Sequence, residues 1–146
     1  MNQITDLSQI IIEVDGKPLA PEEARRLGEA RIQQRLSAPA QCELVFFDSS
    51  GPPGDAPTIS PGASLRIDVR NQEPELFTGE VTAVEYVYGS GGGRETRVRA
   101  YDLLHRLRKR QPVRAHVQVT LADLAREMAA AAGLSVESGG NHNAFC

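Results

Sequence analysis

The segment from Leu76 to Leu107 constrains the fold more than any other part of the chain. Its first half, Leu76–Tyr88, is rich in β-branched and aromatic residues, which favour a strand. Five small residues, Gly89–Gly93, then reverse the chain, and Arg94–Ala100 alternates apolar and charged residues as a returning strand does. Helical spacing in Tyr101–Leu107 ends the unit. The chain is therefore built around an antiparallel hairpin, and no part of this segment requires a catalytic side chain.

Further strands are predicted on both sides of this hairpin. The segments with the composition of strands are Ser8–Val14, Ala30–Leu36, Cys42–Phe47, Ala63–Arg70 and Val113–Val119. In Ala63–Arg70, Leu65, Ile67 and Val69 share one face, and in Ala30–Leu36, Ile32 and Leu36 do so. Cys42–Phe47 has apolar residues on both faces, which predicts a central position in the sheet.

The segments between these strands have clear breakers. Pro21–Leu27 has a proline followed by two acidic residues, which favours a short helical turn over a strand. Asp48–Pro61 holds four of the nine prolines and is predicted to be a surface loop.

One main helix is predicted over residues 120–133. Thr120 and Asp123 form a start that resembles a capping box, and Gly133 ends the helix. Its apolar residues fall at helical spacing and need a partner surface: Leu121, Leu124, Ala125, Met128 and Ala132. The sequence thus predicts a single β-rich (α+β) domain over residues 1–146, a β-barrel or curved antiparallel sheet of six or seven strands with this helix packed on it.

Composition excludes several classes of protein. No apolar run approaches the roughly 20 residues of a membrane span, and the N-terminus lacks the features of a signal peptide, so assembly in the bacterial cytoplasm is expected. With 5% aromatics and no Trp, a stacking platform for bases or sugars is poorly supplied. Cys42 and Cys146 are expected to be free thiols.

No arrangement of residues predicts catalysis, a cofactor or a metal. His105, His116 and His142 are isolated from one another along the chain, and no metal site is predicted from them. No serine lies in a G-x-S-x-G elbow. Gly89–Gly93 lacks the Gly-Lys-Ser/Thr ending of a phosphate loop and precedes a strand, so it is interpreted as a hairpin tip. We expect a protein that is not an enzyme.

Basic residues gather in one part of an acidic chain. Residues 94–114 hold eight Lys and Arg against Glu95 and Asp102, a balance of +6, whereas the rest of the chain carries −9. The cations at 106–114 could neutralise phosphates, which makes a nucleic-acid-binding module the alternative hypothesis. A contact with acidic surfaces of a neighbouring subunit fits at least as well, and the expected interface residues are Arg97, Arg99, Arg106, Arg108, Lys109 and Arg110.

Three pieces of sequence resemble the N-terminal part of the phage late control D family. They are the "F-x-G-x-V" pattern of Phe77–Val81, the "Y-D-x-x-H-x-L" pattern of Tyr101–Leu107, and the helix that begins near Thr120. That family is related to the VgrG-type spikes of type VI secretion and to the hub proteins of phage-like contractile injection systems.

The resemblance implies a structural baseplate hub that joins the hexameric inner tube of a contractile tail to the trimeric spike. Its implied partners are further copies of itself, the inner tube protein, a spike or spike-tip protein and other baseplate proteins, within a virion or phage-like particle. No membrane contact is expected in the assembled resting state, and nucleic acid is not an expected partner. Members of the family form homotrimers with two tube-like domains per chain and extend beyond the equivalent of Cys146. The chain is therefore expected to be the N-terminal part of a longer hub, or else a single-domain relative that forms a hexamer.

Overall fold

The structure is a computed structural model that describes residues 9–48, 59–71, 73–90, 92–109 and 117–136. The chain divides into two compact units, Met1–Leu104 and His105–Cys146.

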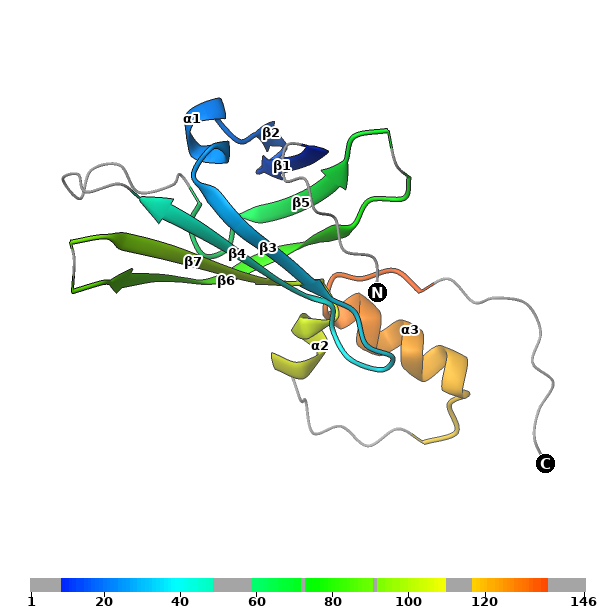
Figure 1. Ribbon diagram of the computed structural model, residues 1–146. Helices are drawn as coiled ribbons and strands as arrows, with labels where there is room; N and C mark the ends of the chain where they lie inside the picture. The colour runs from blue at the N-terminus through cyan, green and yellow to red at the C-terminus, as the bar shows by residue number, and fades with distance from the viewer. Residues whose placement is uncertain (1–8, 49–58, 72, 91, 110–116, 137–146) are drawn as a thin grey trace. The chain divides into compact units, whose positions relative to one another are not determined.

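The first unit is a seven-stranded antiparallel sheet (Figure 1). Its strands are β1 (Ile10–Val14), β2 (Lys17–Pro18), β3 (Leu27–Gln33), β4 (Gln41–Asp48), β5 (Ser64–Val69), β6 (Phe77–Tyr88) and β7 (Arg94–Tyr101). Their spatial order is β2-β1-β5-β6-β7-β4-β3, so the β6–β7 hairpin lies at the centre. The sheet curls into a half-barrel, and the prediction of a β-rich curved antiparallel sheet is confirmed.

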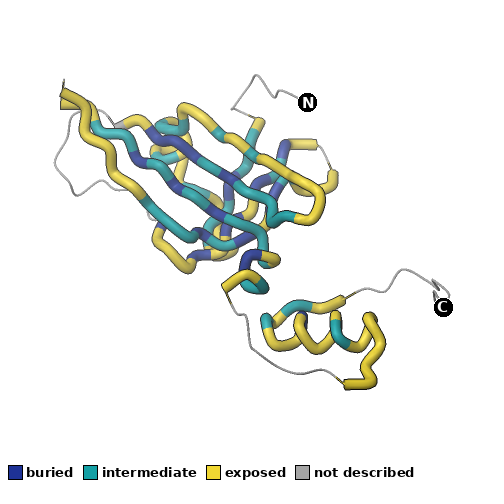
Figure 2. The backbone as a smooth tube through the Cα atoms, turned by 90° about the horizontal axis from the view of Figure 1, so that it is seen from below, coloured by how far each residue is buried: buried dark blue, intermediate teal, exposed yellow. Residues whose placement is uncertain are grey.

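Alternate residues of the strands fill the inside of the half-barrel with an apolar core. The core residues are Ile12, Cys42, Leu44, Phe46, Ile59, Ala63, Leu65, Ile67, Phe77, Val81, Val98 and Ala100. Leu27, Ala30 and Ile32 of β3 pack against this core while partly exposed. Figure 2 shows the buried and less buried positions alternating along the central strands. This alternation follows from the two-residue period of a strand, which sends successive side chains to opposite faces.

The length of β6 lets it join two parts of the sheet. Residues 77–80 pair with β5 on one side, whereas residues 80–88 pair with β7 on the other. Gly79 lies where the two pairings meet, and a Cβ there would overlap the carbonyl oxygen of Tyr101 and lie 2.6 Å from the ring of Phe77. The glycine of the "F-x-G-x-V" pattern is therefore required by the close approach of the β7 backbone.

The structure corrects the predicted bounds of one strand. The strand expected at Ala30–Leu36 is β3, which starts at Leu27 and ends at Gln33. Leu36, expected to face inward with Ile32, is 99% exposed. The reason is a turn in which the Ala38 amide donates to the Arg35 carbonyl and Ser37 adopts a φ of 62°. Leu36 thus belongs to the connection between β3 and β4.

Two further predictions are confirmed, and one predicted strand is not seen in the residues described. The helical turn predicted at Pro21 is confirmed as α1 (Pro21–Ala24), with Pro at its first position. Leu65, Ile67 and Val69 are all buried, as predicted. The strand expected at Val113–Val119 is not seen at residues 117–119, and its remaining residues lie outside the described ranges.

The second unit contains two helices, α2 (His105–Lys109) and α3 (Leu121–Ala131). Thr120 begins α3, because its hydroxyl accepts a hydrogen bond of 3.2 Å from the Asp123 amide and donates one of 2.6 Å to the Asp123 carboxylate. The hydroxyl of Thr120 lowers the pKa of Asp123. Gly133 ends the helix with a φ of 73°. The predicted helix is confirmed, and its packing on the sheet stays a prediction.

Candidate subunit interface

The solvent-facing side of strands β3, β4, β7 and β6 carries charges in cross-strand rows. Because opposite residues of paired strands share a face, the register places Arg31, Glu43 and Arg99 in one row. It places Glu29, Val45, Arg97 and Glu85 in the next. Charges of opposite sign alternate over β3, β4 and β7 in the first row, whereas in the second row the buried Val45 separates Glu29 from Arg97 and Glu85.

Ion pairs join these charges to one another. Arg99 binds Glu85 diagonally across the hairpin through two bonds, from Nη1 to Oε1 at 3.1 Å and from Nη2 to Oε2 at 3.2 Å. Arg31 binds Glu29 along β3 at 2.6 Å. Arg97 donates to Glu95, and this hydrogen bond, together with the carboxylate's charge, raises the pKa of Arg97. The face is therefore close to electrically balanced.

The six predicted interface residues fall in different places. Arg97 and Arg99 lie on β7, where they alternate with the buried Thr96, Val98 and Ala100. Arg106, Arg108 and Lys109 lie on α2 in the second unit. Arg110 is outside the described residues. An interface that uses all six stays a prediction.

The end of the β6–β7 hairpin exposes apolar side chains that the sequence analysis did not single out. Tyr86 is 45% exposed, Val87 41% and Tyr88 71%, and Phe47 at the end of β4 is 56% exposed. Phe47 belongs to the strand that was predicted to lie centrally, whereas β4 lies next to the edge strand β3. The Phe47 ring lies over Gly28 of β3 on the solvent side. The sequence signal for these exposed residues was the run of β-branched and aromatic residues at 86–88, which lies beyond the last core position of β6.

Asp102 organises the corner that follows β7. Its Oδ2 accepts a hydrogen bond of 2.8 Å from the Ala40 amide, and its Oδ1 accepts one of 3.0 Å from the Leu104 amide. The Asp102 amide in turn donates to the Ala40 carbonyl at 3.0 Å. The aspartate of the "Y-D-x-x-H-x-L" pattern therefore has a structural role.

The groups that could carry chemistry are poorly placed for it. Cys42 is buried, and desolvation, with a smaller contribution from the charge of Glu43, raises the pKa of its thiol to about 12. His105 is buried at the start of α2. His116, His142 and Cys146 lie outside the described residues. No group of three or more His, Cys, Asp or Glu that could hold a metal occurs among the residues the structure describes.

One surface depression lies beside the turn between β5 and β6. It is lined by Arg66, Asp68, Glu73, Pro74 and Glu75. Arg66 binds Asp68 across 3.0 Å. The lining contains no Ser, Thr, Cys, Lys or His side chain. Over the described part of the chain, no helix is long and apolar enough to cross a membrane.

Comparison with known proteins gives a likeness of fold. The sequence matches no family model and no curated protein. The structure resembles the crystal structure of the 43 kDa tail protein of prophage MuSo2 from Shewanella oneidensis, with a TM-score of 0.64, 17% identity, and coverage of 86% of this chain and 38% of that one. It also resembles a tail protein from Neisseria meningitidis MC58, with a TM-score of 0.60, 18% identity, and coverage of 84% of this chain and 34% of that one. The chain thus spans less than two fifths of either protein and shares with both the fold of this part.

Proposed function

We propose that this protein is a structural component of a phage tail or of a phage-like contractile injection particle. The observation that carries the proposal is the likeness of its curled antiparallel sheet to two tail proteins over more than four fifths of the chain. The resemblance of Phe77–Val81 and Tyr101–Leu107 to the late control D family points to the same class of protein.

Within that class, we assign the chain to the baseplate hub. There it adapts the sixfold inner tube to the threefold spike, as a trimer if each chain supplies two tube-like domains and as a hexamer if each supplies one. Its partners are other copies of itself, the inner tube protein and the spike. The work is geometric, because a ring of repeated subunits needs complementary surfaces and no turnover.

The chemistry of the described residues agrees with a role of this kind. Cys42, the one described thiol, is buried and protonated at neutral pH. Two residues of the family-like patterns have structural roles. Gly79 leaves room for the close approach of the Tyr101 carbonyl, and Asp102 holds the corner with Ala40. The pattern that suggested a family is therefore a pattern of folding.

Nucleic-acid binding receives little support from the charged face. Binding of a polyanion requires cations that are available to phosphates. Arg97 and Arg99 are instead held by Glu95 and Glu85. The cations at 106–114 that suggested nucleic acid lie on α2 or outside the described residues, and a binding experiment tests them. The experiment is a titration of the protein with duplex and with single-stranded DNA at low salt. We expect no measurable affinity for either.

The proposal is tested by electron microscopy of the parent particle with this chain tagged and labelled with gold. We expect the label at one level of the tail, between the inner tube and the spike. A label confined to the capsid, or absent from purified particles that are complete, would overturn the assignment.

A further inference from the structure

Two strand edges of the sheet are open among the described residues. The first is the outer edge of β3, residues 27–33, which pairs only with β4. The second is the distal half of β6, residues 82–88. It pairs with β7 on one side, but β5 reaches only as far as Glu80, and Ala63 extends that contact to Val81. In Figure 1, β3 and the distal part of β6 border the group β6-β7-β4-β3 on opposite sides.

The remaining end of the sheet offers little room for a further strand, because β2 and Leu19 pair with residues 12–14 of β1 and leave only Ile10 and Ile11 without a neighbour on that side among the described residues. β2 has two residues, Lys17 and Pro18, and both are exposed. Proline has no amide hydrogen to donate, and a short edge with a lysine and a proline is a common protection against added strands. Growth of the sheet is therefore directed to β3 and β6.

The strand directions at the two open edges allow an antiparallel pair between copies. β6, β7, β4 and β3 are each antiparallel to the next, so β3 runs opposite to β6. When β3 of one copy lies beside β6 of another, the new pair is again antiparallel. Four strands per copy preserve this alternation for any number of copies.

The side chains at these edges select one register. With Arg31 opposite Glu85 of the next copy, a cation paired with Glu29 in its own copy meets a carboxylate paired with Arg99, and the two ion pairs join into one network across the contact. On the inner face this register sets Ala30 opposite Tyr86, and Ile32 opposite Val84. Those four residues continue the apolar face of the sheet and cover the half-exposed Tyr86.

We infer that β3 of one copy pairs antiparallel with the distal half of β6 of the next copy, with Arg31 opposite Glu85. The inference rests on the proposed function, because a repeated structural subunit is what requires a second copy. A head-to-tail contact of this type uses different surfaces on the two copies, so it propagates, and it produces a closed ring when its rotation closes.

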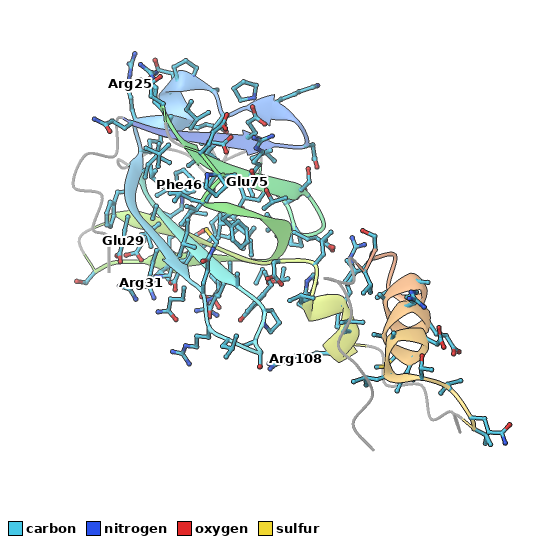
Figure 3. The ribbon with its side chains drawn as sticks, turned by 90° about the vertical axis from the view of Figure 1, so that its right-hand side faces the viewer. Arg25, Glu29, Arg31, Phe46, Glu75 and Arg108 are labelled. Carbon is cyan, nitrogen blue, oxygen red and sulfur yellow. The ribbon has the colours of Figure 1, made fainter. Side chains whose placement is uncertain are left out.

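A second copy is the occupant that the charges favour. Glu29 and Arg31 project from β3 outside the region where Phe46 fills the core (Figure 3). Charged residues on an edge strand repel most added strands, and the bulge between Leu27 and Glu29 distorts the start of this edge. In the register with Arg31 opposite Glu85, Glu29 lies opposite Val87, so the match with β6 rests on one cross-copy charge pair and on the apolar inner face that both strands share.

The test is a cysteine cross-link within the whole 146-residue chain carrying Cys146→Ser. Directly opposite residues of an antiparallel pair have Cβ atoms about 5 Å apart, within reach of a short bis-maleimide. The double variant Arg31→Cys, Glu85→Cys is expected to give a ladder of covalent oligomers on a denaturing gel. A mixture of the two single variants should stop at dimers.

A matched control uses the same strands and the same face. The double variant Glu29→Cys, Ala83→Cys is four residues out of register, a separation of about 13 Å along the strand, and should give no ladder with the short reagent. Arg31→Glu, which sets two carboxylates opposite each other, should weaken association by roughly fivefold or more, whereas Arg35→Glu, in the turn after β3, should leave it unchanged.

The outcomes separate this inference from the proposed function. Assembly into rings without the in-register cross-link, or equal cross-linking by both double variants, would overturn the edge pairing and leave the tail assignment standing. An in-register ladder from a chain whose gold label is absent from the tail would support the pairing and remove the assignment. A monomer with no cross-link contradicts the pairing.

Discussion

Asp102 and Ala40 bind each other twice, through the Asp102 carboxylate with the Ala40 amide and through the Asp102 amide with the Ala40 carbonyl. These two bonds, 2.8 and 3.0 Å long, join the end of β7 to the segment that leads into β4. They fix the corner at which the first unit ends.

Replacement of Asp102 tests this corner. Asp102→Ala leaves the partly buried amide of Ala40 without its acceptor, which should lower the free energy of unfolding by about 1–3 kcal/mol. Asp102→Asn retains one acceptor oxygen and should lose less. Denaturant unfolding followed by circular dichroism measures both, and an Asp102→Ala variant as stable as the parent would refute the role.

Gly79 should tolerate no side chain. Gly79→Ala places a Cβ against the carbonyl of Tyr101, and relief of the overlap requires the β6–β7 pairing to shift, at a cost of about 1–3 kcal/mol. Gly93→Ala is the control, because a Cβ there meets nothing within 4 Å. Thermal unfolding should show a clear loss for the first variant only, and equal losses would contradict the explanation.

Two adjacent phenylalanines should differ sharply. Phe46 is 1% exposed and belongs to the core. Phe46→Ala should therefore cost about 3–5 kcal/mol. Phe47→Ala, on the solvent side, should change the stability of the isolated chain by less than about 1 kcal/mol. Unfolding curves in urea measure the stability loss of each variant. A larger loss for Phe47→Ala than for Phe46→Ala would mean that Phe47, and not Phe46, points into the core.

Cys42 should make the protein less stable in strong alkali. Its folded pKa of about 12 lies above the ordinary thiol value of 9.0, so the folded state retains a proton that the unfolded state loses. The contribution of this thiol is fully present below pH 9 and is lost as the pH rises from about 9 to about 12, by about 1.4 kcal/mol per unit.

Comparison of two variants isolates this effect from other titrating groups. In a Cys146→Ser background, the difference in unfolding free energy between Cys42 and Cys42→Ala should fall across this pH range. A difference that stays constant would show that the thiol is not desolvated. At pH 8, a thiol reagent should modify Cys42 only after unfolding.

The sequence predicted most of the sheet, because its strands have strong local signals. Leu65, Ile67 and Val69 alternate with polar residues, and Gly89–Gly93 permits one simple reversal. The cap at Thr120 was equally readable, since its hydroxyl satisfies an amide three residues away. Such contacts depend on near neighbours in the chain.

The rest depended on distant residues. Leu36 has the spacing of an inward residue, but the turn at Ser37 ends the strand before it. Gly79 and Asp102 were visible in the sequence only as parts of a pattern. Their roles depend on contacts with Tyr101 and with Ala40, which strand pairing brings close. The open edge of β6 follows from the short reach of β5, which no local signal records.

If this chain is a building block of a closed assembly, its mass in solution shows it most directly. Light scattering of the purified chain over a wide range of concentrations should approach three or six times the 15.8 kDa of one chain and decline on dilution. A constant 15.8 kDa up to the highest concentration would contradict it.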